Sequence, residues 1–234
     1  MKFDGSRSTP DLYSRLTSCL AAGIHVGLEM ILEIDPTEPE PWLLARAEQV
    51  LRDGGVVVMP TDTVYGMACG ITHPEAIRRI YRLKDMDPKK PLSILVSDMT
   101  MVGRYARGVS NPAFRLLKRV LPGPYTFIFR ASPDVPKVML RKRRTIGIRM
   151  PDNPIVLALL DELGEPLLSS SIRGPEQDFT NDPEEIDAAL GDDVDMVIDG
   201  GILLPVPSTV VDLSGSEPIL LREGKGDVET LELF

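Results

Sequence analysis

The sequence has few of the residues that bind metals or form disulfides. Its 234 residues include 2 cysteines, Cys19 and Cys69, and 2 histidines, and no Cys-x-x-Cys pair occurs. A structural zinc site needs about four such ligands at close spacing, and without a Cys-x-x-Cys pair the sequence shows no metal-ligand cluster of this kind. We expect two free thiols in a reducing cytoplasm. Because Cys69 has no evident histidine partner, we expect a packed core thiol rather than a nucleophile.

Several other signatures are missing as well. No stretch reaches the roughly 18–20 apolar residues of a transmembrane helix, and the first residues lack the basic-then-apolar layout of a signal peptide. Neither GxxxxGK[ST] nor GxGxxG occurs, which disfavours the common nucleotide-binding folds. His25 and His73 are the only histidines available to a Ser-His-Asp set, and no such set can be recognised. The sequence therefore favours a protein without a membrane span or a serine triad.

The composition that is present indicates a soluble globular chain. Apolar residues make up 43% and charged residues 26%, and the net charge is −9. An acidic protein is not suited to non-specific nucleic-acid binding, although a local basic run such as residues 141–144 could contact RNA. A solvated surface is the other interpretation of that run, and we favour it.

Helical and strand patterns alternate along the chain without repeats or low-complexity linkers. We expect one α/β domain with a twisted mixed parallel/antiparallel sheet of about seven or more strands, flanked by helices. Residues 1–29 differ from the rest, and Met30 offers a second start. One hypothesis is that residues 1–29 are an N-terminal extension upstream of the true start, which leaves 30–234 as the single domain. Helices are expected over 38–53, 74–83, 98–106, 112–120, 155–163 and from 182, and strands over 56–59, 93–96, 125–129, 145–150, 167–171, 196–199, 209–213 and 219–222.

Polar side chains gather where the predicted strands end. Hydroxyls donate and accept hydrogen bonds, and a guanidinium binds carboxylate or phosphate through two parallel bonds. A cavity lined by such groups suits a small anionic or zwitterionic ligand, such as an amino acid or a nucleotide. The residues concerned are Thr61, Thr63, Thr126, Arg149, Ser169, Ser170, Ser171, Ser208, Thr209 and Arg222.

Six short motifs occur in order along the chain. The segment 60–66 resembles P-T-[ED]-T-x-Y-G, and 90–92 resembles N-P-L. The others are P-G-P-x-T at 122–126, V-R-x-P at 148–151, S-T-V-V-D at 208–212 and L-R-x-G at 221–224. Together they resemble the motifs of the YrdC/YciO family, which includes threonylcarbamoyl-AMP synthase. The resemblance covers most of the chain and implies a YrdC-like (YrdC/RibB-type) fold with a large concave, positively charged cavity.

The resemblance also implies ligands and residue roles. Synthase members of the family bind L-threonine, bicarbonate and ATP with Mg²⁺, and they release pyrophosphate as they form threonylcarbamoyl-AMP for a tRNA adenosine. The resemblance assigns a catalytic role to Lys84, places Thr63, Arg149, Ser171 and Ser208 at the threonine, and places Thr145, Arg173, Arg222 and Lys90 at ATP or AMP. It implies no metal held by the protein's own side chains.

The synthase signature is incomplete. Its K-x-R element reads Lys84-Asp85-Met86, and its S-x-N element reads Ser171-Ile172-Arg173. Lys90 stands where the family has asparagine, and Leu95 stands near an expected histidine. An Arg that clamps phosphate is not replaced by any other cation. These departures, together with the run from 170 to 186, resemble the YciO branch more than the synthases.

Two functions from different classes therefore remain. One is a threonylcarbamoyl-AMP synthase or a related enzyme that uses ATP. The other is a non-catalytic protein that binds a nucleotide, tRNA or double-stranded RNA. A hydrolase or sensor of an adenylated or carbamoylated metabolite is a third possibility.

Overall fold

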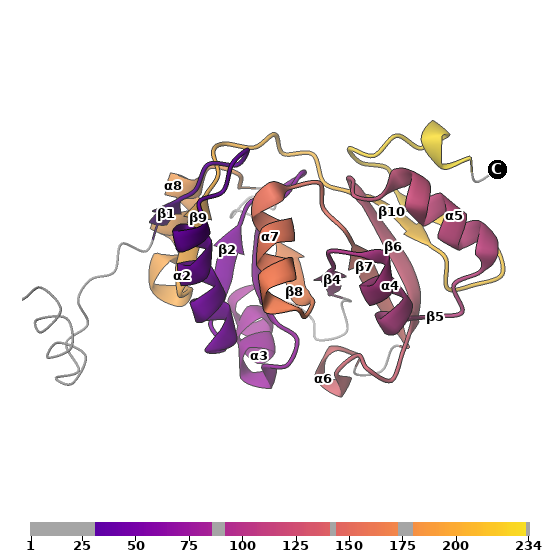
Figure 1. Ribbon diagram of the computed structural model, residues 1–234, viewed down its shortest axis with the longest axis horizontal. Coiled ribbons are helices and arrows are strands. Elements are labelled where there is room, and N and C mark those ends of the chain that lie inside the picture. Colours follow the sequence, from indigo (N-terminus) through magenta and orange to yellow (C-terminus); the bar gives the residue numbers. More distant parts are fainter. Residues whose placement is uncertain (1–30, 86–91, 141–143, 173–179, 233–234) are drawn as a thin grey trace, which may run out of the picture. The chain divides into compact units, whose positions relative to one another are not determined.

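The fold is built on one mixed sheet of 11 strands, seen in the computed structural model (Figure 1). The structure describes residues 31–85, 92–140, 144–172 and 180–232. The strands are β1 (Ile31–Glu33), β2 (Val57–Met59), β3 (Gly66–Gly70), β4 (Ser93–Leu95), β5 (Ala106–Arg107), β6 (Tyr125–Ala131), β7 (Thr145–Arg149), β8 (Leu167–Ser171), β9 (Met196–Asp199), β10 (Thr209–Asp212) and β11 (Ile219–Arg222). Their order is β1-β9-β2-β3-β8-β4-β7-β6-β10-β11, and β5 pairs with β6.

The sheet contains both parallel and antiparallel pairs, as expected from the sequence. The pairs β1–β9, β2–β9, β4–β7 and β6–β10 are parallel. The pairs β2–β3, β3–β8, β4–β8, β6–β7, β5–β6 and β10–β11 are antiparallel. The predicted mixed α/β class is therefore confirmed.

Helices cover both faces of the sheet. Successive side chains of each strand point to opposite faces, and apolar side chains on each face pack against helices. On β2, Val57 packs in a core cluster with α2 (Pro41–Arg52) and α7 (Pro154–Leu163), whereas Val58 packs in a second cluster. The second cluster contains side chains of α3 (Pro74–Leu83), α4 (Met99–Tyr105), α5 (Asn111–Val120), α6 (Lys137–Leu140) and α8 (Pro183–Leu190). Short 3₁₀ turns occur at η1 (Gly191–Asp193) and η2 (Glu229–Leu231).

The helix boundaries follow local signals in the sequence. The Asp98 side chain accepts a hydrogen bond of 2.7 Å from the Met101 amide and so caps α4. Asp182 caps α8 in the same way, at 2.9 Å from the Glu184 amide. Helix α7 ends at Gly164, which has φ 66°, a backbone conformation that favours glycine. Local chemistry therefore sets where these helices begin and end.

Four short elements were not predicted. Strand β3 reads Gly-Met-Ala-Cys-Gly, and residues of this kind are depleted in strands. It forms because β2 and β8 pair with it on both sides. The strands β1 and β5 and the helix α6 have 3, 2 and 4 residues, too few for a periodic pattern.

The connection from β9 to β10 is unusually long in space. These strands are consecutive in the chain, yet β2, β3, β8, β4, β7 and β6 lie between them in the sheet. Residues 200–208, here called the strap, make this crossing (Figure 1). The Tyr65 hydroxyl donates to the Gly201 carbonyl at 2.8 Å and accepts from the Gly200 amide at 3.1 Å, which anchors the first end of the strap. Burial raises the pKa of Tyr65 to about 12, so this hydroxyl keeps its proton.

Within the described residues, no helix is long and apolar enough to cross a bilayer.

Cys69, in β3, should resist alkylation while the protein is folded. Its exposed fraction is 0%, and burial raises the pKa of its thiol to about 12. In a Cys19→Ser variant at pH 8, iodoacetamide should modify the native thiol on the order of a thousandfold more slowly than the urea-unfolded thiol, since thiolate is the reactive form. Mass spectrometry measures both rates, and equal rates would contradict the packed-thiol interpretation.

Candidate functional site

The segment 60–66, here called the threonine tip, follows β2 and is held by its own hydroxyls. The Thr61 Oγ1 accepts hydrogen bonds from the amides of Thr63 and Val64, at 3.1 and 3.2 Å, and donates to the Val64 carbonyl at 2.7 Å. Thr61 and Thr63 are both 2% exposed. The tip is therefore a rigid turn with two buried hydroxyls, rather than an ordinary strand end.

Arg149, at the end of β7, points into this turn. Its Nη2 donates to the Thr63 Oγ1 at 2.7 Å and to the Thr61 Oγ1 at 3.2 Å, and it pairs with the Asp62 carboxylate. Both members of the ion pair have side chains that are 8% exposed. Burial lowers the pKa of the Arg149 guanidinium, and the nearby Asp62 carboxylate opposes this shift. The group stays charged, as arginine does in proteins.

Two buried polar atoms of this pair face no partner among the described residues. They are Nε of Arg149 and Oδ2 of Asp62. Buried polar atoms are nearly always hydrogen-bonded, so an unpartnered donor beside an unpartnered acceptor is unusual. The ion pair therefore contains one hydrogen-bond donor and one anionic acceptor that no described residue satisfies.

Sheet twist brings these distant segments together. Strands β2 and β7 are separated by β3, β8 and β4, a distance of about 19 Å across a flat sheet. Twist of roughly 20–25° at each of these four steps turns β7 by about 80–100° relative to β2. The end of β7 can therefore face the end of β2 across the sheet, which allows one side chain to connect them.

A row of small and hydroxyl residues crosses the strands β8, β4, β7 and β6. Ser169 on β8 lies opposite Ser93 on β4, and Ser93 lies opposite Gly147 on β7. A Cβ on Gly147 would lie 2.5 Å from the Ser93 Oγ and 3.4 Å from the Thr126 Cγ2 on β6. We call Ser169, Ser93, Gly147 and Thr126 the hydroxyl stripe. It lies on the sheet face that α2 and α7 cover elsewhere, since Ser93 alternates with the Ile94 of the opposite cluster.

The stripe continues into a second polar group at β10. The hydroxyls of Thr126 and Ser208 lie 2.8 Å apart. Arg222 on β11 donates to the Ser208 carbonyl through Nε at 2.9 Å and Nη2 at 2.8 Å, and to its Oγ at 3.1 Å. On the opposite face of the sheet, since Ser170 alternates with Ser169 along β8, the Lys84 Nζ donates to the Ser170 Oγ at 2.5 Å, and it also donates to the Ser171 carbonyl.

The structure thus places the predicted site residues in three groups. Thr63 lies with Arg149, Ser208 lies with Arg222, and Ser171 lies with Lys84. Thr145 begins β7, about 13 Å along the strand from Arg149, and by strand register it lies in the row of Ser171. Lys90 and Arg173, like Met86, lie outside the described residues. The ligand roles of all these residues remain predictions.

Three further residues at the site were not assigned roles from the sequence. Asp62 pairs with Arg149, and the Lys225 Nζ donates to the Asp62 carbonyl. Asn181 accepts from the Tyr65 amide at 3.0 Å and is 6% exposed. Asp62 could have been predicted as a site residue from its position inside the threonine-tip motif. No local pattern indicates Asn181 or Lys225, because each acts across more than 100 residues of sequence.

Comparison with known proteins identifies the family. Residues 49–224 match the model of Sua5, YciO and YrdC proteins, which is described as "Telomere recombination". The chain belongs to this family. It is 43% identical over 198 residues to the uncharacterized protein YciO of Escherichia coli, which covers 84% of this chain and 96% of YciO. The predicted membership of the YrdC/YciO family is therefore confirmed.

Two solved structures and one enzyme of the Sua5/YciO/YrdC family are also similar to this chain. The crystal structure of E. coli YciO matches with a TM-score of 0.82 at 40% identity and covers 87% of this chain and 100% of that chain. Pyrococcus abyssi Sua5 complexed with L-threonine matches with a TM-score of 0.81 at 29% identity, over 86% of this chain and 59% of that one. The threonylcarbamoyl-AMP synthase of Bacillus subtilis is 31% identical over 203 residues, 86% of this chain and 58% of that enzyme.

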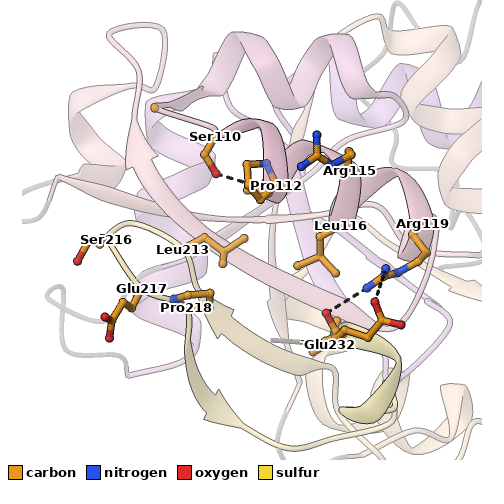
Figure 2. Close-up of a pocket in the computed structure, with 14 residues that line it drawn as sticks. Ser110, Pro112, Arg115, Leu116, Arg119, Leu213, Ser216, Glu217, Pro218 and Glu232 are labelled. Atoms are coloured by element: carbon orange, nitrogen blue, oxygen red, sulfur yellow. Dashed lines mark hydrogen bonds and ion pairs between the residues drawn. The ribbon is translucent and has the colours of Figure 1, made fainter. Parts of the chain in front are cut away.

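A separate pocket of about 590 Å³ lies beside α5 (Figure 2). Leu116 and Leu213 approach each other within it, and the Arg119–Glu232 ion pair, at 2.8 Å, lies at one end. Of the predicted site residues that the structure describes, none lines this pocket. Helix α5 packs on the sheet face opposite the hydroxyl stripe, so the pocket and the candidate site are distinct.

Removing the carboxylate of Asp62 should destabilise the protein strongly. Asp62→Asn leaves the Arg149 charge buried without its counter-ion, which typically costs about 3–5 kcal/mol. The matched control is Glu75→Gln, which breaks the exposed Arg78–Glu75 pair and should cost less than about 1 kcal/mol. Urea unfolding measures both values. Equal small losses would show that the Asp62–Arg149 pair contributes little.

Gly147 should not tolerate a side chain. Gly147→Ala places a methyl group against Ser93 in the hydroxyl stripe, and such overpacking costs about 1–3 kcal/mol. Gly103 in α4 has no atom within 4 Å of its would-be Cβ, so Gly103→Ala should gain about 0.5–1 kcal/mol from helix propensity. Thermal unfolding of the two variants should therefore shift in opposite directions, and a stable Gly147→Ala would contradict the close packing.

Proposed function

We propose that this chain binds L-threonine and ATP and forms threonylcarbamoyl-AMP, the activated group for modification of a tRNA adenosine. The observation that carries the proposal is the buried Arg149–Asp62 pair, with an unpartnered Nε and an unpartnered Oδ2 at the threonine tip. Support also comes from the family relatives, which include a threonylcarbamoyl-AMP synthase and a Sua5 complexed with L-threonine.

The charges of this pair match those of an amino acid. A guanidinium binds a carboxylate through parallel hydrogen bonds, so Arg149 would take the threonine carboxylate. The Oδ2 of Asp62 would accept from the ammonium group. The hydroxyls of Thr63 and Ser208 would complete the site, and both side chains are buried, at 2% and 5% exposure. A zwitterion is favoured over a simple anion because the site presents both signs of charge.

The remaining groups suit a nucleotide and a carbamate. After the bound ammonium group has lost a proton to solvent, the threonine amine and bicarbonate would give a carbamate and water. A carbamate oxygen would then attack the α-phosphorus of ATP while pyrophosphate leaves. The cations Lys84 and Arg222 would contact the phosphates, as would the predicted Lys90 and Arg173, and Thr145 would lie near the nucleotide. Lys84 would act by stabilising charge on the reacting phosphate.

Magnesium would enter bound to the phosphates of ATP. In the described part of the chain, no group of three or more His, Cys, Asp or Glu could hold an ion without them. Mg²⁺ commonly binds through substrate phosphates and one or two carboxylates, so this arrangement fits the donor set. The ion would neutralise the charge that develops on the leaving pyrophosphate.

A second candidate function follows from Met86, which replaces the arginine of the synthase K-x-R element, and from Arg173, which replaces the asparagine of S-x-N. Loss of a phosphate-clamping arginine lowers phosphoryl-transfer rates by about 10³-fold or more. A YciO-type protein with these changes would bind ATP, AMP or double-stranded RNA without catalysing the reaction.

Pyrophosphate release from ATP tests the proposal directly. With Mg²⁺ and bicarbonate present, release should depend on added L-threonine. Arg149→Lys keeps the charge but loses the planar fork, so it should lower threonine-dependent turnover about 10–100-fold, while Arg107→Lys on the exposed end of β5 should not. If turnover is absent while ATP or AMP still raises the melting temperature, the binding function is favoured over the synthase.

A further inference from the structure

We infer that Lys225 binds the ligand's oxyanion, a carboxylate or a phosphate, together with Arg149 at the threonine tip. This inference builds on the proposed function, since it assigns one more residue to the same site. Lys225 follows the L-R-x-G element of β11, and nothing in the motif pattern includes it. The inference rests on its placement, its charge and its contacts.

The backbone directs Lys225 toward the tip. Its amide donates to the Pro207 carbonyl at 2.8 Å, at the second end of the strap. From there its side chain reaches the threonine tip, where Nζ donates to the Asp62 carbonyl. Strands β2 and β10 have five other strands between them, so this contact joins the two distant parts of the sheet at the candidate site.

Two cations therefore contact the same residue. Arg149 pairs with the carboxylate of Asp62, and Lys225 donates to its carbonyl oxygen. One carboxylate between two cations leaves an excess positive charge at the tip. No carboxylate pairs with Lys225 among the described residues. An added oxyanion is the chemical group that would balance this charge.

Lys225 also keeps the capacity to bind. An ammonium group has three N–H donors, and the Asp62 carbonyl takes one of them. The residue is exposed, so its flexible stem can turn its ammonium toward a ligand without a large desolvation cost. Arg149 is fixed and buried at the tip, whereas Lys225 reaches it from the solvent side. The pair could therefore hold an oxyanion from two directions.

The simplest other interpretation is that Lys225 only fastens the C-terminal segment to the tip. The two interpretations differ in how ligand affinity responds to salt. A cation that contacts the ligand makes binding weaken as salt rises, because ions screen the attraction. A purely structural contact would, when lost, weaken binding by the same factor at low and high salt.

The test is titration calorimetry with L-threonine, inorganic phosphate and AMP at low and high salt. Lys225→Met should weaken binding of the responsive probe about 5–20-fold at low salt, as expected for loss of one hydrogen bond to a charged group, with a smaller salt dependence than wild type. Lys225→Arg should restore affinity to within about threefold, because charge and donors are kept. Lys137→Met, on the exposed first turn of α6, is the matched control and should bind as wild type.

The probes separate the possible oxyanions and the two proposals. If Lys225→Met loses affinity only for L-threonine, Lys225 binds the carboxylate. If it loses affinity only for phosphate and AMP, Lys225 binds the phosphate. If wild type binds phosphate or AMP through Lys225 but never binds L-threonine, the proposed synthase fails and this inference stands. Wild-type affinity in Lys225→Met, or a loss that is independent of salt, overturns the inference and leaves the proposed function intact.

Discussion

The contact of Arg149 with the threonine tip is the interaction on which the candidate site depends. It joins the end of β7 to the end of β2, and one guanidinium contacts Thr61, Asp62 and Thr63. A buried ion pair gains little stability on balance, because desolvation offsets the attraction between the charges. The pair is therefore better explained by what it positions: a rigid turn with fixed hydroxyls and one donor and one acceptor beside each other.

The same strands build the core and the candidate site, on opposite faces. On β4, β7 and β6, apolar residues such as Ile94, Ile148 and Phe127 enter the core. Ser93, Gly147 and Thr126 alternate with them and form the hydroxyl stripe. Small side chains pack closely on the stripe face, as at Gly147, while large apolar ones on the other face form the core.

The sequence predicted most helices and strands, because periodicity and capping act over a few residues. It also predicted the family, since six motifs occur in order, and the comparisons confirm that assignment. It did not predict β3, which exists only because β2 and β8 pair with it. The partners of Arg149 and Lys225 were missed for a related reason. They are set by sheet order and twist, which depend on segments 86 and 163 residues apart.

The strap from β9 to β10 limits the shape of the whole sheet. Its nine residues, 200–208, give ten Cα–Cα steps from the end of β9 to the start of β10, which can span at most about 33–36 Å. Seven strand spacings already require about 34 Å in a flat sheet. Because β9 and β10 run in the same direction, a flat sheet would also add the length of a strand to this distance. Roughly half a turn of accumulated twist removes that extra length. The strap therefore acts as a tether of fixed length, and the sheet that carries Arg149, Ser208 and Lys225 cannot flatten while the strap is intact.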